Sequence, residues 1–174
     1  MPDGDEESPA LLENLESVLR TIRDASRNRD PLTAESARGW QARCVEGLHV
    51  PHAALVGRFR GEPPLEGVEV HVGGESGVLA SDVAAALRAF ESKLHEVLRR
   101  LDEALPPGGL PDGDQLAAVL DAMAWTHAEW VRIHPFVNGN GRTARLFANS
   151  VAMRYGLPPF VRLRPRPDSG YGAA

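Results

Sequence analysis

The segment IHPFVNGNGRTAR, residues 133–145, decides both the fold and the function that this sequence predicts. Pro135 ends the helical pattern that precedes it, and another helical pattern begins near Asn140. The glycines between them allow backbone angles that other residues resist, so a ligand can approach the main chain closely. Because a hydrophobic core requires neither this turn nor the histidine and two arginines beside it, the segment predicts a functional site.

The residue types in this segment are those that bind and transfer phosphate groups. An unperturbed imidazole titrates at about pH 6.5, so His134 can serve as a general base. The helix that opens at residues 139–141 directs free N–H groups and a positive dipole end outward, which suits an anion. Arg142 and Arg145 occupy neighbouring positions of one helix face. Two arginines beside a helix N-terminus suit a di- or triphosphate better than a single carboxylate.

Composition excludes several other classes of function. The chain has 174 residues and a net charge of −5, whereas a general nucleic-acid binder usually carries a basic stripe. Cys44 is the only cysteine, which excludes an internal disulfide and a cysteine-based metal site. No apolar run reaches the length of a membrane span, and the acidic N-terminus does not resemble a signal peptide. We therefore expect a cytoplasmic protein without membrane or nucleic-acid partners.

Helical periodicity dominates the chain. Residues 1–8 read as a flexible acidic N-terminus, and residues 9–174 as a single domain. We expect Ser8 to cap the first helix, and the fourth helix, apolar on most sides, to be central and buried. Apolar positions recur at helical spacing in five segments: 9–27, 33–48, 82–104, 114–133 and 140–155.

One segment has the pattern of a β-strand instead. Val68, Val70 and Val72 alternate with polar residues, and glycines and prolines bracket them. This period of two is typical of a half-exposed strand. The predicted fold class is mainly α with a small β-hairpin.

Residues 134–145 resemble the signature of the Fic family, His-Pro-Phe-x-(Asp/Glu)-Gly-Asn-Gly-Arg-x-x-Arg, at eight of nine fixed positions. GRFR at 57–60 resembles the Gly-x-Tyr/Phe-Arg step before the family's β-hairpin flap, and the valine strand falls where that flap is expected. GLPPFVRL at 156–163 resembles the segment after the motif helix. The resemblance covers about residues 40–174 and implies a Fic-like helical domain with a hairpin flap.

The resemblance implies a protein adenylyltransferase, which moves AMP from ATP to a Ser, Thr or Tyr hydroxyl of a target protein. His134 would deprotonate that hydroxyl. Arg142 would contact the phosphates during transfer, and Arg145 would reach the γ-phosphate. The flap would present the target segment as an added strand. The backbone of Gly139, Asn140 and Gly141 would hold the α- and β-phosphates, and Val68, Val70 and Val72 would line the flap.

Asn138 is where the sequence departs from the family, whose acidic residue at this position is a Mg²⁺ ligand. An amide oxygen can coordinate Mg²⁺ but adds no negative charge, so metal affinity should fall. Two alternatives stay open. The domain could transfer another phosphate-containing group, as the related Doc toxins transfer a phosphoryl group. It could also be a nucleotide-binding or interaction module with weak catalysis.

The family's self-inhibitory motif, Ser/Thr-x-x-x-Glu-Gly/Asn, is not matched in this sequence. The Glu-Gly and Glu-Asn pairs begin at Glu13, Glu46 and Glu66, and the residues four positions earlier carry no hydroxyl: Pro9, Ala42 and Glu62. We therefore expect restraint by a separate small inhibitory protein, as in a toxin–antitoxin pair, or no restraint.

Overall fold

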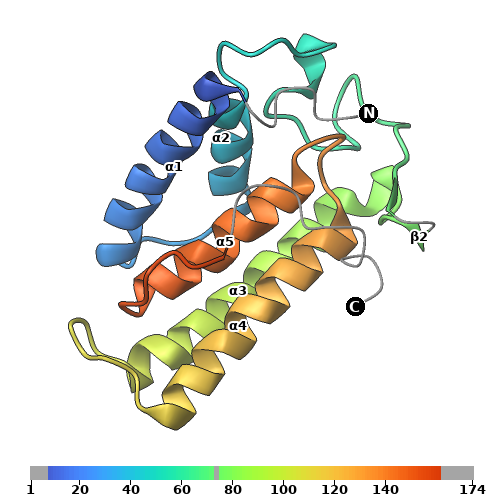
Figure 1. The fold of residues 1–174 in the computed structure, drawn as a ribbon. Helices are drawn as coiled ribbons and strands as arrows, with labels where there is room; N and C mark the ends of the chain where they lie inside the picture. The colour runs from blue at the N-terminus through green and yellow to red at the C-terminus, as the bar shows by residue number, and fades with distance from the viewer. Residues whose placement is uncertain (1–7, 73–74, 162–174) are drawn as a thin grey trace.

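The computed structural model describes residues 8–72 and 75–161 (Figure 1). Most of the expected residues 1–8, and the chain beyond residue 161, lie outside the described residues. The division into an N-terminal segment and one domain stays a prediction. The described part contains five α-helices, two short 3₁₀ helices and two short strands: α1 (Pro9–Arg27), α2 (Ala34–Cys44), η1 (Ala53–Leu55), β1 (His71–Val72), β2 (Glu75–Ser76), η2 (Ala80–Asp82), α3 (Val83–Ala104), α4 (Gly113–Ile133) and α5 (Asn140–Arg154).

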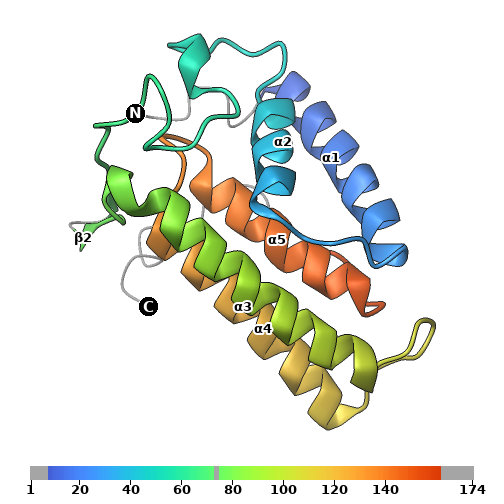
Figure 2. The same cartoon turned by 180° about the vertical axis from the view of Figure 1, so that it is seen from behind.

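Helix α5 occupies the centre of the molecule. It lies between the pair α1 and α2 on one side and the pair α3 and α4 on the other (Figures 1 and 2). Small residues such as Ala144, Ala148 and Ala152 are fully buried on α5 and let neighbouring helices approach it on several sides. A motif at the start of α5 is therefore anchored in the core.

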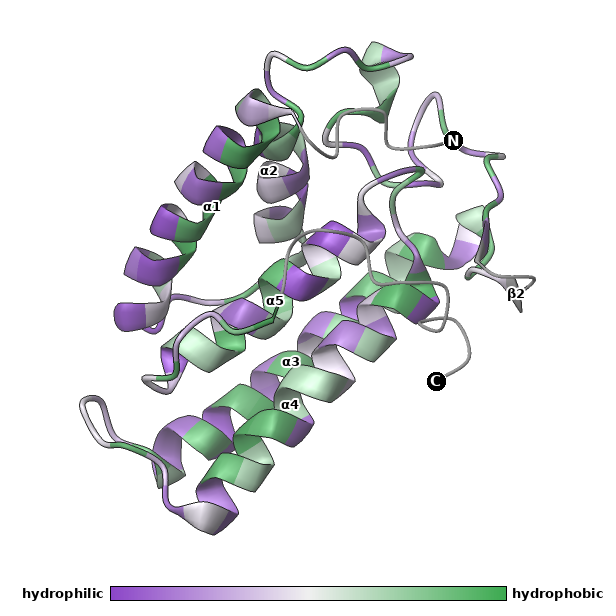
Figure 3. Cartoon of the chain, viewed as in Figure 1, coloured by the Kyte–Doolittle hydropathy of each residue, from purple (hydrophilic) through white to green (hydrophobic). Residues whose placement is uncertain are grey.

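The expectation that the fourth helix is the central, buried one was wrong. One face of α4 contacts α3 and α5, but Ala117, Ala124 and Ala128 are exposed and Leu120 keeps 42% of its surface accessible. Figure 3 shows hydrophobic residues along much of the visible side of α4. An apolar composition on all sides does not say how many neighbours a helix has. None of the described helices combines the length and apolarity needed to cross a bilayer.

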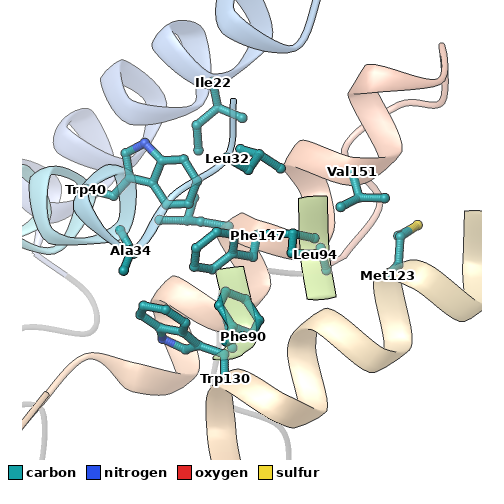
Figure 4. Close-up of a cluster of buried hydrophobic side chains, with 14 of the residues drawn as sticks. Ile22, Leu32, Ala34, Trp40, Phe90, Leu94, Met123, Trp130, Phe147 and Val151 are labelled. Atoms are coloured by element: carbon teal, nitrogen blue, oxygen red, sulfur yellow. The ribbon is translucent and has the colours of Figure 1, made fainter. Parts of the chain in front are cut away.

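Aromatic side chains join four helices in the core (Figure 4). Trp130 of α4 lies 4.7 Å from Phe147 of α5 and 5.4 Å from Phe90 of α3, measured between ring centroids. Trp40 of α2 packs edge-on against Phe147 at 5.0 Å. Aromatic pairs at these separations contribute about 0.5–1.5 kcal/mol each beyond area burial. This cluster fixes the last turn of α4 against the first half of α5.

The segment predicted as a strand forms a shorter ladder than expected. Only His71–Val72 pairs with Glu75–Ser76, in antiparallel register. Val68 and Val70 are half-buried and Glu69 is exposed, so the alternation persists outside the ladder. The carbonyl of Val68 instead accepts a hydrogen bond from Arg60 at 3.2 Å. Because the Val68 carbonyl is bound by the Arg60 side chain and not by a neighbouring strand, β1 does not begin at residue 68.

Two other expectations also fail locally. Helix α2 ends at Cys44 rather than residue 48, because the Asn14 amide of α1 donates to the carbonyls of Cys44 and Glu46. Ser8 precedes α1 but its side chain makes no capping hydrogen bond, and Pro9, which is suited to the first helical turn, starts the helix instead.

Candidate functional site

His134 lies where α4 ends, in an uncommon backbone conformation. Its φ and ψ of 53° and 56° are left-handed, and its N–H still donates to the Trp130 carbonyl at 3.0 Å. A left-handed residue other than glycine is strained and persists only when its surroundings hold it. The chain turns away from α4 at this residue, so the imidazole stands beside the motif turn.

The contacts of the His134 imidazole define its protonation. Its Nδ1 lies 3.1 Å from the carbonyl oxygen of Val131, and because a carbonyl can only accept, Nδ1 carries the proton and Nε2 keeps the lone pair. Burial lowers the pKa of His134; the Val131 contact opposes this shift, and the positive charge of Arg60 adds to it. His134 is therefore a neutral base at neutral pH, with Nε2 as the basic atom.

Asn140 closes the loop that follows His134. Its Oδ1 accepts a hydrogen bond from the Phe136 N–H at 2.8 Å, and its Nδ2 donates to the Phe136 carbonyl at the same distance. Phe136 is fully buried and lies 4.9 Å from the ring of Phe59. On the other side, the buried Gln41 amide donates to the carbonyls of Leu55 and Asn138. The loop therefore has one defined shape.

Helix α5 begins without a side-chain cap. Its N-cap is Gly139, with a φ of 92°, and a glycine has no side chain with which to cap the first turn. Thr33 and Asp112 each form a complete capping box at the starts of α2 and α4, whereas Ser8 and Asp82 make no capping bond at the starts of α1 and α3. The N-cap residue of α5 thus supplies no side-chain acceptor to the first N–H groups of the helix. An anion can occupy that position.

The two motif arginines affect residues of different neighbouring helices. Arg142 and Arg145 are both half-buried. Burial raises the pKa of Cys44 in α2 to about 11, and the positive charge of Arg142 opposes this rise. His127 of α4 has a pKa lowered by burial and by the charge of Arg145. Positive charge is thus spread between α2 and α4 across the start of α5.

The other polar residues near the motif do not form a metal site. Glu129 pairs with Arg132 through two contacts of 2.7 and 2.8 Å, so it is not available to a metal beside His127. In the part of the chain that the structure describes, no three His, Cys, Asp or Glu side chains form a group suited to a metal ion. Asn138 is exposed at the turn, and its amide could contribute one neutral oxygen.

The structure brings together the motif residues that the sequence predicted, because they share one short loop between packed helices. Of the flap residues, Val68 and Val70 lie near the His134 end of α4, where Arg60 bonds to both segments. Val72 belongs to β1 by its backbone. Sequence reasoning missed the roles of Gln41 and Arg60, which are 4% and 1% exposed. Glutamine and arginine are usually exposed, so their residue types do not reveal that these two side chains are buried and bind several backbone groups.

Comparisons with known proteins agree with this geometry. The "Protein adenylyltransferase Fic" of Drosophila willistoni is 34% identical over 103 residues, which are 56% of this chain and 18% of that protein. The protein of the same name from Nematostella vectensis is 48% identical over 50 residues, 28% of this chain and 12% of that protein. The match thus spans less than a fifth of the length of these relatives.

A solved structure shares the fold. It is a Fic domain-containing signaling protein from Bacteroides thetaiotaomicron, with a TM-score of 0.66, 24% identity, and coverage of 88% of this chain and 51% of that one. The profile of the Fic/DOC family matches residues 31–152, which include the motif loop and all of helices α2 to α4. The chain belongs to the Fic/DOC family.

Proposed function

We propose that this domain transfers AMP from ATP to a hydroxyl group of a target protein. The observation that carries the proposal is the pairing of two features within six residues: a neutral base at the end of α4 and an uncapped helix start at Gly139. A base and an anion site at this spacing suit attack on a bound phosphate. The names of the Drosophila and Nematostella relatives agree with it.

In the proposed reaction, Nε2 of His134 takes the proton of the target hydroxyl. The hydroxyl oxygen then forms a bond to the α-phosphorus of ATP, and the bond between that phosphorus and the α–β bridging oxygen breaks. Pyrophosphate leaves, and the proton remains on the imidazole until solvent removes it. The fixed Nδ1–H contact with Val131 supports this direction of proton transfer, because it leaves Nε2 as the acceptor.

The charges for this reaction come from the start of α5. The N–H groups of Gly139, Asn140 and Gly141 would hold the α- and β-phosphates. Arg142 would contact the phosphates as negative charge moves toward the leaving group, and Arg145 would contact the γ-phosphate. Phosphoryl and nucleotidyl transfer depend mainly on such positioning and charge neutralisation. A loop held by Asn140 and Gln41 provides donors that need little rearrangement.

We further propose that Mg²⁺ enters with ATP rather than as a resident ion. Mg²⁺ in proteins is usually held by one or two carboxylates together with phosphates and water. Asn138 offers one neutral amide oxygen at the exposed turn, which fits an ion that takes most of its ligands from the nucleotide. Bound there, Mg²⁺ would neutralise phosphate charge.

The segment around β1 is the proposed docking surface for the target. Val68 and Val70 are half-buried beside the His134 end of α4, and the backbone of β1 leaves an edge for an added strand. The separate small inhibitory protein remains a prediction. Identifying the proteins that co-purify with the whole protein can test it.

Two labels on ATP test the proposal. The protein is incubated with a panel of candidate target proteins and with ATP labelled at the α- or the γ-phosphate. Label from the α-phosphate alone supports AMP transfer, whereas label from the γ-phosphate alone indicates phosphoryl transfer. Binding of ATP without transfer of either label to any protein indicates a nucleotide-binding module. The matched control is His134→Ala, which retains the α5 phosphate site.

A further inference from the structure

Arg60 is a buried cation that binds backbone carbonyls on both sides of His134. The residue is 1% exposed and lies on the loop before β1. Its Nε donates to the His134 carbonyl at 2.8 Å, and one terminal nitrogen donates to the Ile133 carbonyl at 3.2 Å. Its backbone N–H donates to the Pro135 carbonyl at 2.7 Å. Arg60 therefore binds three consecutive carbonyls at the point where α4 ends.

These contacts explain how His134 is held in its left-handed conformation. The last carbonyls of a helix have no partners within the helix and carry the negative end of its dipole. A buried guanidinium satisfies them and matches their charge. Because it binds the carbonyls on both sides of the His134 Cα, it fixes the peptide planes that direct the imidazole.

The same guanidinium also binds both ends of the hairpin segment. Its terminal nitrogens donate to the carbonyl of Val68 at 3.2 Å and that of Val78 at 2.7 Å. Glu69 pairs with it at 3.3 Å and accepts a hydrogen bond from the Ala80 N–H at 3.0 Å. One side chain thus joins Val68 and Val78, at the two ends of the hairpin segment, to the residue that carries the base.

We propose that Arg60 is a positioning residue, which holds the His134 imidazole and the hairpin in one fixed relation so that a target docked on the hairpin meets Nε2. The inference rests on the proposed AMP transfer. Arg60 itself touches neither ATP nor the target hydroxyl in this proposal. Lysine cannot replace it, because an ammonium presents its donors from one point whereas the four side-chain carbonyl contacts surround a planar fork.

The first test compares Arg60→Lys with Arg38→Lys. Arg38 binds the Gly57 carbonyl at 3.0 Å, pairs with Glu62 and covers the Phe59 ring, and none of its hydrogen bonds or ion pairs within the described residues is to residue 133 or 134. Both variants should lose stability. A misplacement of about 1 Å can reduce the rate about 10²-fold, so we expect that loss in kcat for Arg60→Lys, with KM for ATP unchanged. Arg38→Lys should keep kcat within about two-fold of wild type.

A spectroscopic readout separates positioning from general destabilisation. In the wild type, the ¹⁵N shifts of the His134 ring should report a proton on Nδ1, because of the Val131 contact. In folded Arg60→Lys the ring should populate both tautomers, and in Arg38→Lys only the wild-type form. Wild-type kcat together with the wild-type tautomer in Arg60→Lys would overturn the proposal.

A second pair of variants applies if Arg60→Lys does not fold. A Cβ at Gly77 would lie 3.1 Å from the His134 Cβ and 3.2 Å from an Arg60 terminal nitrogen, whereas a Cβ at Gly67 meets nothing within 4 Å. Gly77→Ala should therefore lower kcat at least ten-fold, and Gly67→Ala should not. Equal kcat in both alanine variants counts against the proposal. Failure of the proposed function is distinct, because then the wild type itself transfers no AMP.

Discussion

Replacing Asn140 with alanine should destabilise the protein through two buried backbone groups rather than through lost side-chain volume. The side chain is 2% exposed and forms two hydrogen bonds of 2.8 Å with the N–H and carbonyl of Phe136. Each buried group left without a partner costs about 1–3 kcal/mol. Alanine has the higher helix propensity and recovers about 0.5 kcal/mol at this first helical position. For the two groups together the net loss should be about 1.5–5.5 kcal/mol.

The chain offers a matched control on the same helix. Asn149 is 1% exposed and makes the same pair of bonds with the backbone of Val161, at 2.8 and 2.9 Å. Asn149→Ala should therefore destabilise the protein to a similar degree. It should leave the loop from His134 to Gly139 intact, because Asn149 lies more than two turns further along α5.

Urea denaturation followed by circular dichroism measures both losses. We expect lower midpoints for both variants with unchanged slopes, which indicates a change in stability rather than in the unfolded state. In the absence of urea, AMP transfer should fall more than ten-fold in Asn140→Ala and stay near wild type in Asn149→Ala. A loss of less than about 0.5 kcal/mol for Asn140→Ala, or equal loss of transfer in both, would refute the reasoning.

Other perturbations address the base, the pH dependence and the metal. His134→Ala should lower transfer by about 10²–10⁴-fold without changing ATP binding, as rate assays and calorimetry can check. Because burial lowers the pKa of His134, the transfer rate should be constant above about pH 6.5 and fall only below it; a midpoint above that value contradicts the burial argument. The pKa values of His127 and His134 are lowered in the folded protein, so the unfolded state binds more protons than the folded state as the pH falls through about 6.5. The free energy of unfolding should therefore decrease below that pH. Urea titrations at successive pH values measure this decrease. Asn138→Asp should lower the Mg²⁺ concentration that gives half-maximal transfer, and an unshifted midpoint means that residue 138 does not contact the metal.

Local patterns predicted most of the helices, and non-local contacts explain the errors. The expected segments 9–27 and 82–104 agree with α1 and α3 within one residue, because apolar periodicity is a local property. The end of α2 depends on Asn14, 30 residues away from Cys44. The start of β1 depends on a side chain that binds the Val68 carbonyl. Neither contact leaves a periodic signal in the sequence.

The candidate site divides in the same way. The base, the turn and the arginines lie within 12 consecutive residues, so their chemistry could be recognised from the sequence. Their geometry depends on Gln41 and Arg60, which are distant in sequence from the loop they hold. Burial gives these two residues their importance, and burial of a single polar residue cannot be deduced from its type.

The contrast between the two helix ends at this loop is a physical argument for the proposed function. The negative end of α4 meets the buried guanidinium of Arg60, which belongs to the protein. The positive end of α5 starts at Gly139, which has no side chain and so provides none of the capping bonds seen at α2 and α4. A helix start left open beside two arginines gains stability from an external anion. Since His134 stands at the first of these ends and the anion would bind at the second, the loop between them sets the distance from base to phosphate.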